Sequence, residues 1–318
     1  MNKESIIVKP KSSNIVRKAE ALLRARYSLS KLAIKLITVI ISMLSKNDAD
    51  FKIYILKVAD FKELTGTESN KIYDDLRNTA DELLTKKIEF DDKKVGFMLT
   101  RWIASAEYSI GSGEIEIEIS QKLKPLLLQL KEGNYLNYEL KNILALKSTY
   151  IIRLYERLKH EYNKIVKYKG HTVATYEIYI EDLREEFKIP SSYQYSSHIK
   201  KRIFEKAIIE FKENTDIEIA YRESLKRSKK VIAVEFTIRE NTTNLIEYLK
   251  NVKTFITYMR KNFINKDIME SQGMILSISK DGRIYDKKTL KEYNKDEALQ
   301  VWNIWYGLAM EDKLKIMK

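Results

Sequence analysis

The sequence predicts an α+β protein built from two tandem winged-helix domains, each a helix-turn-helix with a β-hairpin wing, and a small α+β C-terminal extension. Three observations support this fold. The same order of elements occurs twice, the apolar residues of two repeated helices recur every four positions, and each repeat ends in β-type segments. We place the domains at residues 1–137, 138–240 and 241–318.

Each repeat begins with a long helix and continues through a short strand into two further helices. The first helix contains the longest apolar run, which Lys35, Thr38 and Ser42 interrupt, so we expect it to be buried and not to span a membrane. Gly66 and Pro190 are breakers at the ends of the middle helices. The expected elements are helix 28–45, strand 51–56, helix 58–66 and helix 69–84, and then helix 138–160, strand 175–180, helix 180–190 and helix 196–211.

The last helices of the two repeats match in a register of 127 residues. Their apolar residues are spaced by four, which places them on one stripe of each helix. A small Ala within each stripe permits the close approach of a neighbouring helix. The matched residues are Ile72, Leu76, Ala80 and Leu84 in the first helix, and Ile199, Ile203, Ala207 and Phe211 in the second.

Segments with β-type patterns follow each matched helix and predict the wings. The segment "EIEIEIS" (114–120) alternates strictly between apolar and polar residues, as a half-buried strand does. In the second repeat, "RESLKRSKK" (222–230) is expected to be a loop between two strands. The remaining β-type segments are 86–90, 95–105 and 107–110 in the first repeat, and 215–221 and 231–238 in the second.

Residues 241–318 form a third region with its own elements. We expect helices at 244–263 and 296–314, and between them a hairpin at 274–286 that Asp281 and Gly282 close. Trp302 and Trp305 are expected to anchor this region on the preceding domains, with a partner-binding hot spot as the alternative.

The charge balance favours a polyanionic partner. The formal net charge is +13 and the isoelectric point is about 9.4, which suits nucleic acid or an anionic membrane surface. The excess is spread evenly over the three regions, at +4, +5 and +4. Only local clusters can therefore identify a binding surface.

The sequence gives no indication of catalysis. There is no Cys, the three His have no metal-ligand spacing, and the Gly-Lys pair of a P-loop is absent. We therefore expect no enzyme activity, catalytic residue, metal or cofactor. The N-terminal residues lack the apolar core of a signal peptide, so we expect a cytoplasmic protein.

A basic cluster lies at the start of helix 196–211. On a wheel of 100° per residue, His198, Lys201 and Arg202 point away from the apolar stripe, whereas Lys200 lies on the apolar side. The first turns of the second helix of a helix-turn-helix enter the major groove, and a basic wing beside them suits phosphate contacts. A solvated helix face is the alternative. The predicted DNA-binding residues are Ser197, His198, Lys200, Lys201, Arg202, Lys226, Arg227, Lys229 and Lys230.

The matched helix of the first repeat is acidic instead. It places Asp74, Asp75, Asp81 and Glu82 on its polar side, and carboxylates repel phosphates. We expect the first domain to dimerise or to contact the DNA backbone through residues 17–28 and 91–95. The edge of the strand at 114–120 is the expected dimer contact.

Residues 14–240 resemble the replication initiator (Rep) proteins of iteron-containing plasmids. The resemblance is carried by "LLLQLKEGNYLNYEL" (126–140), by "LALKSTYIIRLYERLK" (144–159) with Arg153, Leu154 and Tyr155, and by "IEDLREEFKIP" (180–190). It continues through "YQYSSHIKKRIFEKAIIEFKENTDIEIAY" (193–221) to "VEFTI" (234–238). Ile199, where the family has an aromatic residue, and Phe211 after Glu210, where it has Ile, are mild departures.

The resemblance implies two winged-helix domains, of which the second is the main reader of double-stranded DNA repeats at the origin. It also implies opening of AT-rich DNA, recruitment of host replication proteins such as the helicase, and dimers that repress the protein's own gene. It implies no nuclease or ATPase. A winged-helix transcriptional regulator without origin function is the alternative. A membrane-surface protein is less consistent, because a basic membrane helix has no hairpin beside it.

Overall fold

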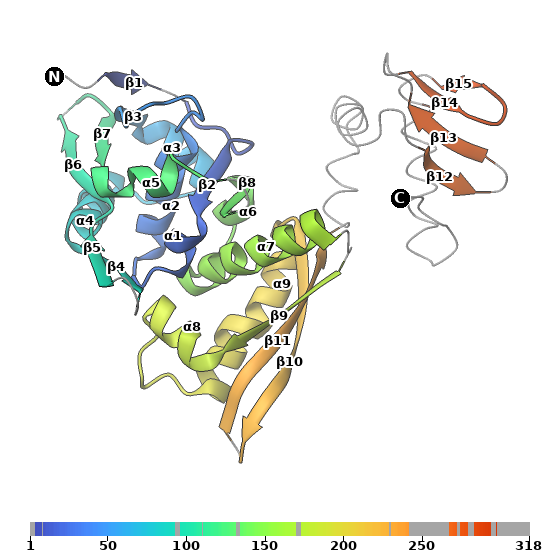
Figure 1. Cartoon of the computed structure of the whole chain (residues 1–318). Helices are drawn as coiled ribbons and strands as arrows, with labels where there is room; N and C mark the ends of the chain where they lie inside the picture. Colours follow the sequence, from blue (N-terminus) through green and yellow to red (C-terminus); the bar gives the residue numbers. More distant parts are fainter. Residues whose placement is uncertain are drawn as a thin grey trace. The chain divides into compact units, whose positions relative to one another are not determined.

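A computed structural model describes residues 4–241 with gaps at 8, 93–95, 110, 132–133, 170–172 and 229, and residues 267–271, 274–278, 283–293 and 297. The chain divides into two compact units, residues 1–241 and 242–318 (Figure 1). The first unit contains both predicted winged-helix domains.

The first domain follows the predicted order of helices and strands, with an added hairpin. Ser30 caps the buried helix α2 by accepting a hydrogen bond from the Ala33 amide, and Gly66 ends α3 in the left-handed conformation (φ 62°). Its elements are β1 (Ser5–Ile7), β2 (Ile15–Ala19), α1 (Glu20–Arg24), α2 (Lys31–Ser42), β3 (Ile53–Lys57), α3 (Val58–Thr65), α4 (Ile72–Thr85), β4 (Ile88–Asp92), β5 (Gly96–Thr100), β6 (Ile103–Tyr108), β7 (Glu114–Ile119), η1 (Gln121–Leu123), α5 (Lys124–Leu127), β8 (Tyr135–Glu139) and α6 (Lys141–Leu144).

The second domain repeats the plan in a shorter form. Its recognition-type helix has two parts, a π-helix, η2, followed by an α-helix, α9. Its elements are α7 (Thr149–Lys169), β9 (Val173–Tyr179), α8 (Ile180–Phe187), η2 (Tyr195–Phe204), α9 (Glu205–Asn214), β10 (Ile217–Arg227) and β11 (Lys230–Glu240).

Sheet topology confirms the internal duplication. In the first domain β3 pairs with β7, which pairs with β6, and in the second β9 pairs with β11, which pairs with β10, all antiparallel. The strands β3 and β9 each lead directly into the middle helix, α3 or α8. The β6–β7 pair therefore corresponds to the wing β10–β11, and β4–β5 is a hairpin that the second domain lacks within its described residues.

The predictions for residues 138–160 and for the edge of β7 were wrong. The expected helix at 138–160 is in fact the end of β8, then α6 and then α7, because Tyr135–Glu139 pairs with Ile15–Ala19 of β2. The strand β7 was expected to offer a free edge for a dimer. It lies between β3 and β6, so both of its edges are already paired.

A continuous apolar core runs through both domains, and α7 is the helix that they share. It contacts α1 and β8 of the first domain as well as β9 and α9 of the second (Figure 1). A boundary between residues 137 and 138 falls within β8, and the helix α7 that follows contributes to both cores.

Arg153 on α7 joins the two domains at the centre of this core. Its guanidinium is buried and donates to the carbonyl oxygens of Ala25 (2.6 Å) and Tyr27 (2.8 Å) in the first domain. It also donates to the carbonyl oxygen of Glu186 (2.5 Å) at the end of α8. The same group lies 3.7 Å from the centroid of the Tyr27 ring, a cation–π contact.

The C-terminal unit contains a four-stranded antiparallel sheet in its described residues. The order is β12 (Asp267–Ser271), β13 (Met274–Ile278), β14 (Ile284–Asp286) and β15 (Glu292–Tyr293). The pairing of β13 with β14 confirms the predicted hairpin. Apart from Glu297, the helices expected at 244–263 and 296–314, with Trp302 and Trp305, lie outside the described residues.

A buried ion pair supports the packing of β2 on α7. Lys18 Nζ lies 2.6 Å from Glu156 Oε1, and both side chains are almost fully buried, at 1% and 2% exposed. Tyr138 donates a second hydrogen bond to the same carboxylate oxygen, and Lys18 also donates to Thr38. Such a pair costs desolvation but is strongly destabilising when only one charge is removed.

We expect Lys18→Met to lower the free energy of unfolding by about 3–5 kcal/mol, because the Glu156 carboxylate then stays buried without its cation. The double variant Lys18→Met/Glu156→Leu should be more stable than this single variant, since it removes both charges. Urea denaturation of the wild type, both single variants and the double variant measures the coupling. Strictly additive losses would show that the two charges act independently.

Candidate nucleic-acid interface

The recognition-type helix begins with a wider turn than an α-helix has. The amide of Ile199 donates to the carbonyl oxygen of Gln194, and that of Glu205 donates to Lys200, so these bonds span five residues. Each turn of η2 therefore contains about one more residue than an α-helical turn. Ile199, Ile203 and Phe204 are buried. Ile203 and Phe204 follow Ile199 by four and five positions, which fits a turn of between four and five residues.

The wider turn corrects the expected orientation of His198. Its ring lies against Tyr193, with centroids 4.6 Å apart and planes at 31°, and it is half-buried instead of pointing fully into solvent. Its Nδ1 is 2.8 Å from the hydroxyl of Ser197. Ser197 and His198 are thus partly engaged within the protein.

Lys201 and Arg202 are the free cations of the π-helical part, η2, in the described chain. Both side chains are exposed, and neither has an ion pair or a hydrogen bond within the described part of the chain. Lys200 behaves differently, because its ammonium lies 3.7 Å from Glu223 on β10. The predicted cluster is therefore divided into two exposed cations and one that reaches toward the wing.

The wing is a long ribbon, which corrects the prediction of a loop at 222–230. The strand β10 continues to Arg227 and β11 starts at Lys230, while irregular pairing between Glu223 and Lys226 bends the ribbon. Arg227 and Lys230 are paired residues at the tip, and both are exposed. Ser228 turns the chain with a φ of 55°, and Lys229 lies outside the described residues.

Glu223 connects the helix to the wing, a role that was not predicted from the sequence. Its carboxylate accepts a hydrogen bond from Tyr195 (3.2 Å) and pairs with Lys226 (2.7 Å) and Lys200 (3.7 Å). The hydrogen bond from Lys226 is the main reason that the pKa of Glu223 lies below its ordinary value. The available signal was that Glu223 is the single acidic residue of the basic segment 222–230.

An aromatic cluster fixes the helix on the sheet behind the basic residues. The Phe204 ring is buried and lies 5.2 Å from the ring centroids of both Tyr221 on β10 and Phe236 on β11. Edge-to-face packing of this kind favours a defined geometry. The cluster therefore holds Lys201 and Arg202 in a fixed relation to the wing.

The first domain lacks these cations at the same positions. In the 127-residue register, Asp74 and Asp75 occupy the places of Lys201 and Arg202. The expected phosphate contacts through residues 17–28 stay a prediction, but carboxylates engage three of the cations in that segment. Lys18 is buried on Glu156, Arg24 pairs with Glu20 and Glu161, and Arg26 pairs with Asp91 and Glu185.

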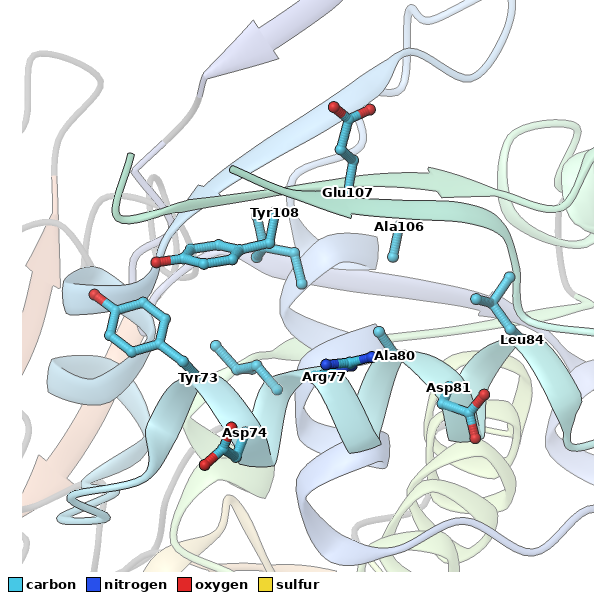
Figure 2. Close-up of a pocket in the computed structure, with 11 residues that line it drawn as sticks. Tyr73, Asp74, Arg77, Ala80, Asp81, Leu84, Ala106, Glu107 and Tyr108 are labelled. Carbon is cyan, nitrogen blue, oxygen red and sulfur yellow. The ribbon is translucent and has the colours of Figure 1, made fainter. Parts of the chain in front are cut away.

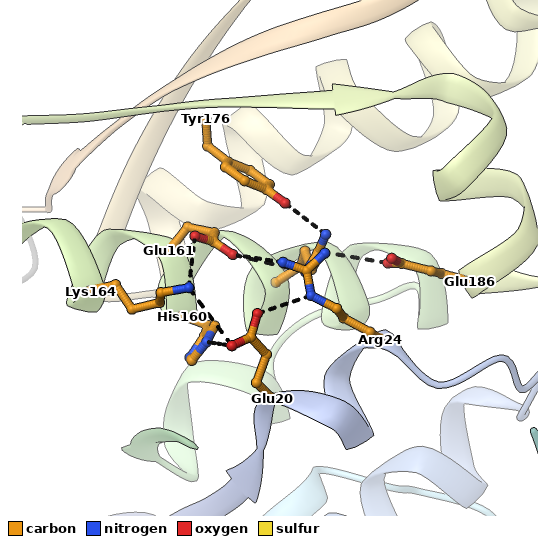
Figure 3. A network of polar contacts seen from close by, with 8 residues as sticks. Glu20, Arg24, His160, Glu161, Lys164, Tyr176 and Glu186 are labelled. Atoms are coloured by element: carbon orange, nitrogen blue, oxygen red, sulfur yellow. Dashed lines mark hydrogen bonds and ion pairs between the residues drawn. The ribbon is translucent and has the colours of Figure 1, made fainter. Parts of the chain in front are cut away.

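Arg24 belongs to a polar network between α1 and α7 (Figure 3). Its guanidinium lies 3.0 Å from Glu20 and 3.2 Å from Glu161, and Lys164 lies 3.7 Å from both carboxylates. His160 is 1% exposed, with Nε2 3.3 Å from Glu20. Burial lowers the pKa of His160 below its ordinary value, against the raising effect of Glu20.

The same network contains a cluster of metal-ligand types. Glu20, His160 and Glu161 each bring one ligand atom within 4.8 Å of the others. However, Arg24 and Lys164 already neutralise both carboxylates, so a divalent ion would have to displace two cations. We therefore interpret the cluster as an ion-pair network that supports the domain junction.

The two wings and the basic recognition-type helix define a double winged-helix protein of the nucleic-acid-binding class. The family models described as "Initiator Replication protein, WH1" and "Initiator Rep protein, WH2" match residues 15–159 and 179–238. The chain therefore belongs to the initiator Rep protein family. The first match includes the N-terminal half of α7.

The fold is similar to that in the "Crystal structure of Pi initiator protein in complex with iteron DNA". The two chains are 16% identical with a TM-score of 0.59, and the match covers 72% of this chain and 98% of that one. The WH1 domain of MSBI1.176, a replication protein isolated from a multiple sclerosis patient, is 17% identical. That match covers 31% of this chain and 78% of that one with a TM-score of 0.26, too low to support a structural argument. In the described residues, no helix has the length and apolar character needed to cross a bilayer.

The buried state of His160 predicts a pH effect on stability. Unfolded His160 titrates near its ordinary pKa of 6.5, whereas the folded pKa is lower, so the unfolded chain takes up the proton first. The stabilising contribution is fully present above pH ~6.5 and is lost as the pH falls toward the folded pKa. Denaturation at pH 7, 6 and 5 should therefore show a steeper loss for the wild type than for His160→Gln. Parallel curves would contradict a neutral, buried imidazole.

Proposed function

We propose that this protein initiates plasmid replication by binding repeated double-stranded DNA sites at the origin through its second domain. The proposal rests on four exposed cations, Lys201 and Arg202 on η2 and Arg227 and Lys230 at the wing tip. None of these four side chains has an ion pair or a hydrogen bond in the described residues. Membership of the initiator family supports it, as does the likeness of the fold to a protein whose structure was determined with iteron DNA.

In this proposal the recognition-type helix contacts the DNA bases and the wing contacts the DNA backbone. Arg202 lies within the first turns of the helix, where a guanidinium can donate two hydrogen bonds to one guanine. Arg227 and Lys230, at the end of the ribbon, are placed to contact phosphates across the adjacent backbone. Lys200 and Lys226 share Glu223, so they orient the wing and add phosphate contacts only when DNA competes with that carboxylate.

We also propose that the protein acts with host partners and without catalysis. As the family resemblance implies, the protein would act in the cytoplasm, help to open the origin, recruit host replication proteins such as the helicase, and repress its own gene as a dimer. It would do so by binding alone, without hydrolysis of DNA or ATP. The supporting observations are that the sequence has no Cys, no P-loop Gly-Lys pair and no metal-ligand spacing of its three His.

Salt dependence tests the proposed function. With about five to eight phosphate contacts, raising the salt concentration from 50 to 200 mM should weaken binding to repeat DNA on the order of 10³-fold. Fluorescence anisotropy with the full chain measures this slope, and supercoiled plasmid carrying the origin should stay unnicked in the same buffer with Mg²⁺. An affinity that is flat across this salt range would overturn the nucleic-acid assignment, and nicking would overturn the non-enzymatic one.

Two variants separate base reading from phosphate contact. Arg202→Ala should cost about 1–3 kcal/mol on the cognate repeat and relax the preference at one base pair, because a bidentate contact is lost. Lys230→Ala should weaken cognate and scrambled DNA equally and lower the salt slope by about one unit. Lys87→Ala, an exposed change in the first domain, is the control and should alter neither. If Lys230→Ala lost specificity while Arg202→Ala did not, the two roles would be reversed.

A further inference from the structure

The two copies of the winged helix differ in how they fill the space between the recognition-type helix and the wing. In the 127-residue register, Arg77 on α4 corresponds to Phe204. Phe204 is fully buried between Tyr221 and Phe236, so the second domain closes this space with its own aromatic rings. Arg77 is exposed and cannot fill the corresponding space in the first domain.

The first domain has a groove at this place (Figure 2). It is a half-open cavity of about 510 Å³ between α4 and the outer wing strand β6. Ala80 on α4 and Ala106 on β6 leave the space empty because neither side chain extends beyond Cβ. Leu76, Leu84 and Ile115 supply apolar walls. Such a lining suits one aromatic or branched aliphatic side chain.

Two tyrosines mark one end of the groove. Tyr73 on α4 and Tyr108 on β6 have ring centroids 5.1 Å apart, and they remain 48% and 38% exposed (Figure 2). Large, rigid side chains with a polar tip are enriched at protein-binding surfaces. The strand β6 is also the outer strand of its sheet in the described chain, so an extended peptide can pair with its free backbone edge.

The charged residues around the groove indicate which kind of ligand it binds. Asp74 and Asp81 on α4 are exposed residues of the groove lining, and Arg77 is the cation beside them, whereas the carboxylate of Glu107 points away from α4 on the other side of β6 (Figure 2). None of the four has an ion pair in the described residues. This local negative charge, on a chain of net charge +13, disfavours phosphates and favours basic groups.

We propose that the groove between α4 and β6 binds an extended basic segment of a partner protein, with one apolar side chain inserted where the second domain places Phe204. The site belongs to the first domain and does not depend on DNA binding by the second. In the second domain, Phe204 thus fills the space between helix and wing. In the first domain, the same space is open to a side chain of a partner protein.

The probe is a fluorescent, end-capped nonapeptide with Phe at its centre and two Lys on each side, used with the full chain. We expect saturable binding, weakened about tenfold or more when the central Phe is replaced by Ala. Replacement of the four Lys by Glu should abolish binding. General attraction cannot produce this pattern, because a Lys-rich peptide is repelled by a protein of net charge +13.

Arg77→Phe is the decisive variant, because it places in the first domain a Phe at the position of Phe204. In the second domain, Phe204 fills the space between helix and wing. It should weaken peptide binding about tenfold or more without lowering the melting temperature. Asn78→Phe places the same side chain one position along α4, at an exposed residue outside the groove lining, and should bind as the wild type does. Both variants should keep wild-type affinity for DNA.

Three results would overturn the proposal. The first is the absence of peptide binding, and the second is equal binding by Arg77→Phe and the wild type. The third is a wild-type dimer that Arg77→Phe converts to a monomer in sedimentation equilibrium, which would identify a second copy of this chain as the occupant. A failure of DNA binding with intact peptide binding would affect only the proposed replication function.

Discussion

The arrangement of the two winged helices depends on the buried guanidinium of Arg153. It takes its acceptors from both domains, and a buried cation that lost them would cost several kcal/mol, so neither domain can shift without replacing these bonds. The neighbouring residues act in the same way. Tyr155 donates to Asp216, and Glu156 accepts from Lys18. The "RLYE" stretch that resembles the initiator family thus joins the domains and does not form part of the basic surface.

Periodicity and internal repetition were sufficient to predict the duplicated plan, the matched helices and the hairpin within the C-terminal unit. They failed where a tertiary contact overrides a local pattern. Residues 135–139 form a strand because they pair with β2, although their sequence continues into a helical pattern. The 100° wheel misplaced His198 because η2 has a wider turn, and a wheel cannot reveal that. Glu223 was missed because its importance lies in three cross-element contacts that no spacing rule contains.

The two domains show how one scaffold can serve opposite electrostatic purposes. Their sheets have the same strand order and their helices share a register, yet Asp74 and Asp75 stand where Lys201 and Arg202 stand in the other copy. The backbone plan is fixed by buried positions such as Ile72 and Ile199, which are apolar in both. Exposed positions carry no such constraint. The two copies can therefore carry opposite charges on the exposed side of the matched helix while keeping the same backbone plan.

The pairing of Lys18 with Glu156 has a consequence for synthesis on the ribosome. The partners are 138 residues apart, which at a translation rate of about 5–20 residues per second corresponds to a delay of about 7–28 s. The strand β2 has no β8 to pair with until residue 139 has been made, and Lys18 has no buried counter-charge until Glu156 of α7 follows. The nascent chain must therefore be held in an unfinished state, and the first domain closes only after the beginning of the second has been translated.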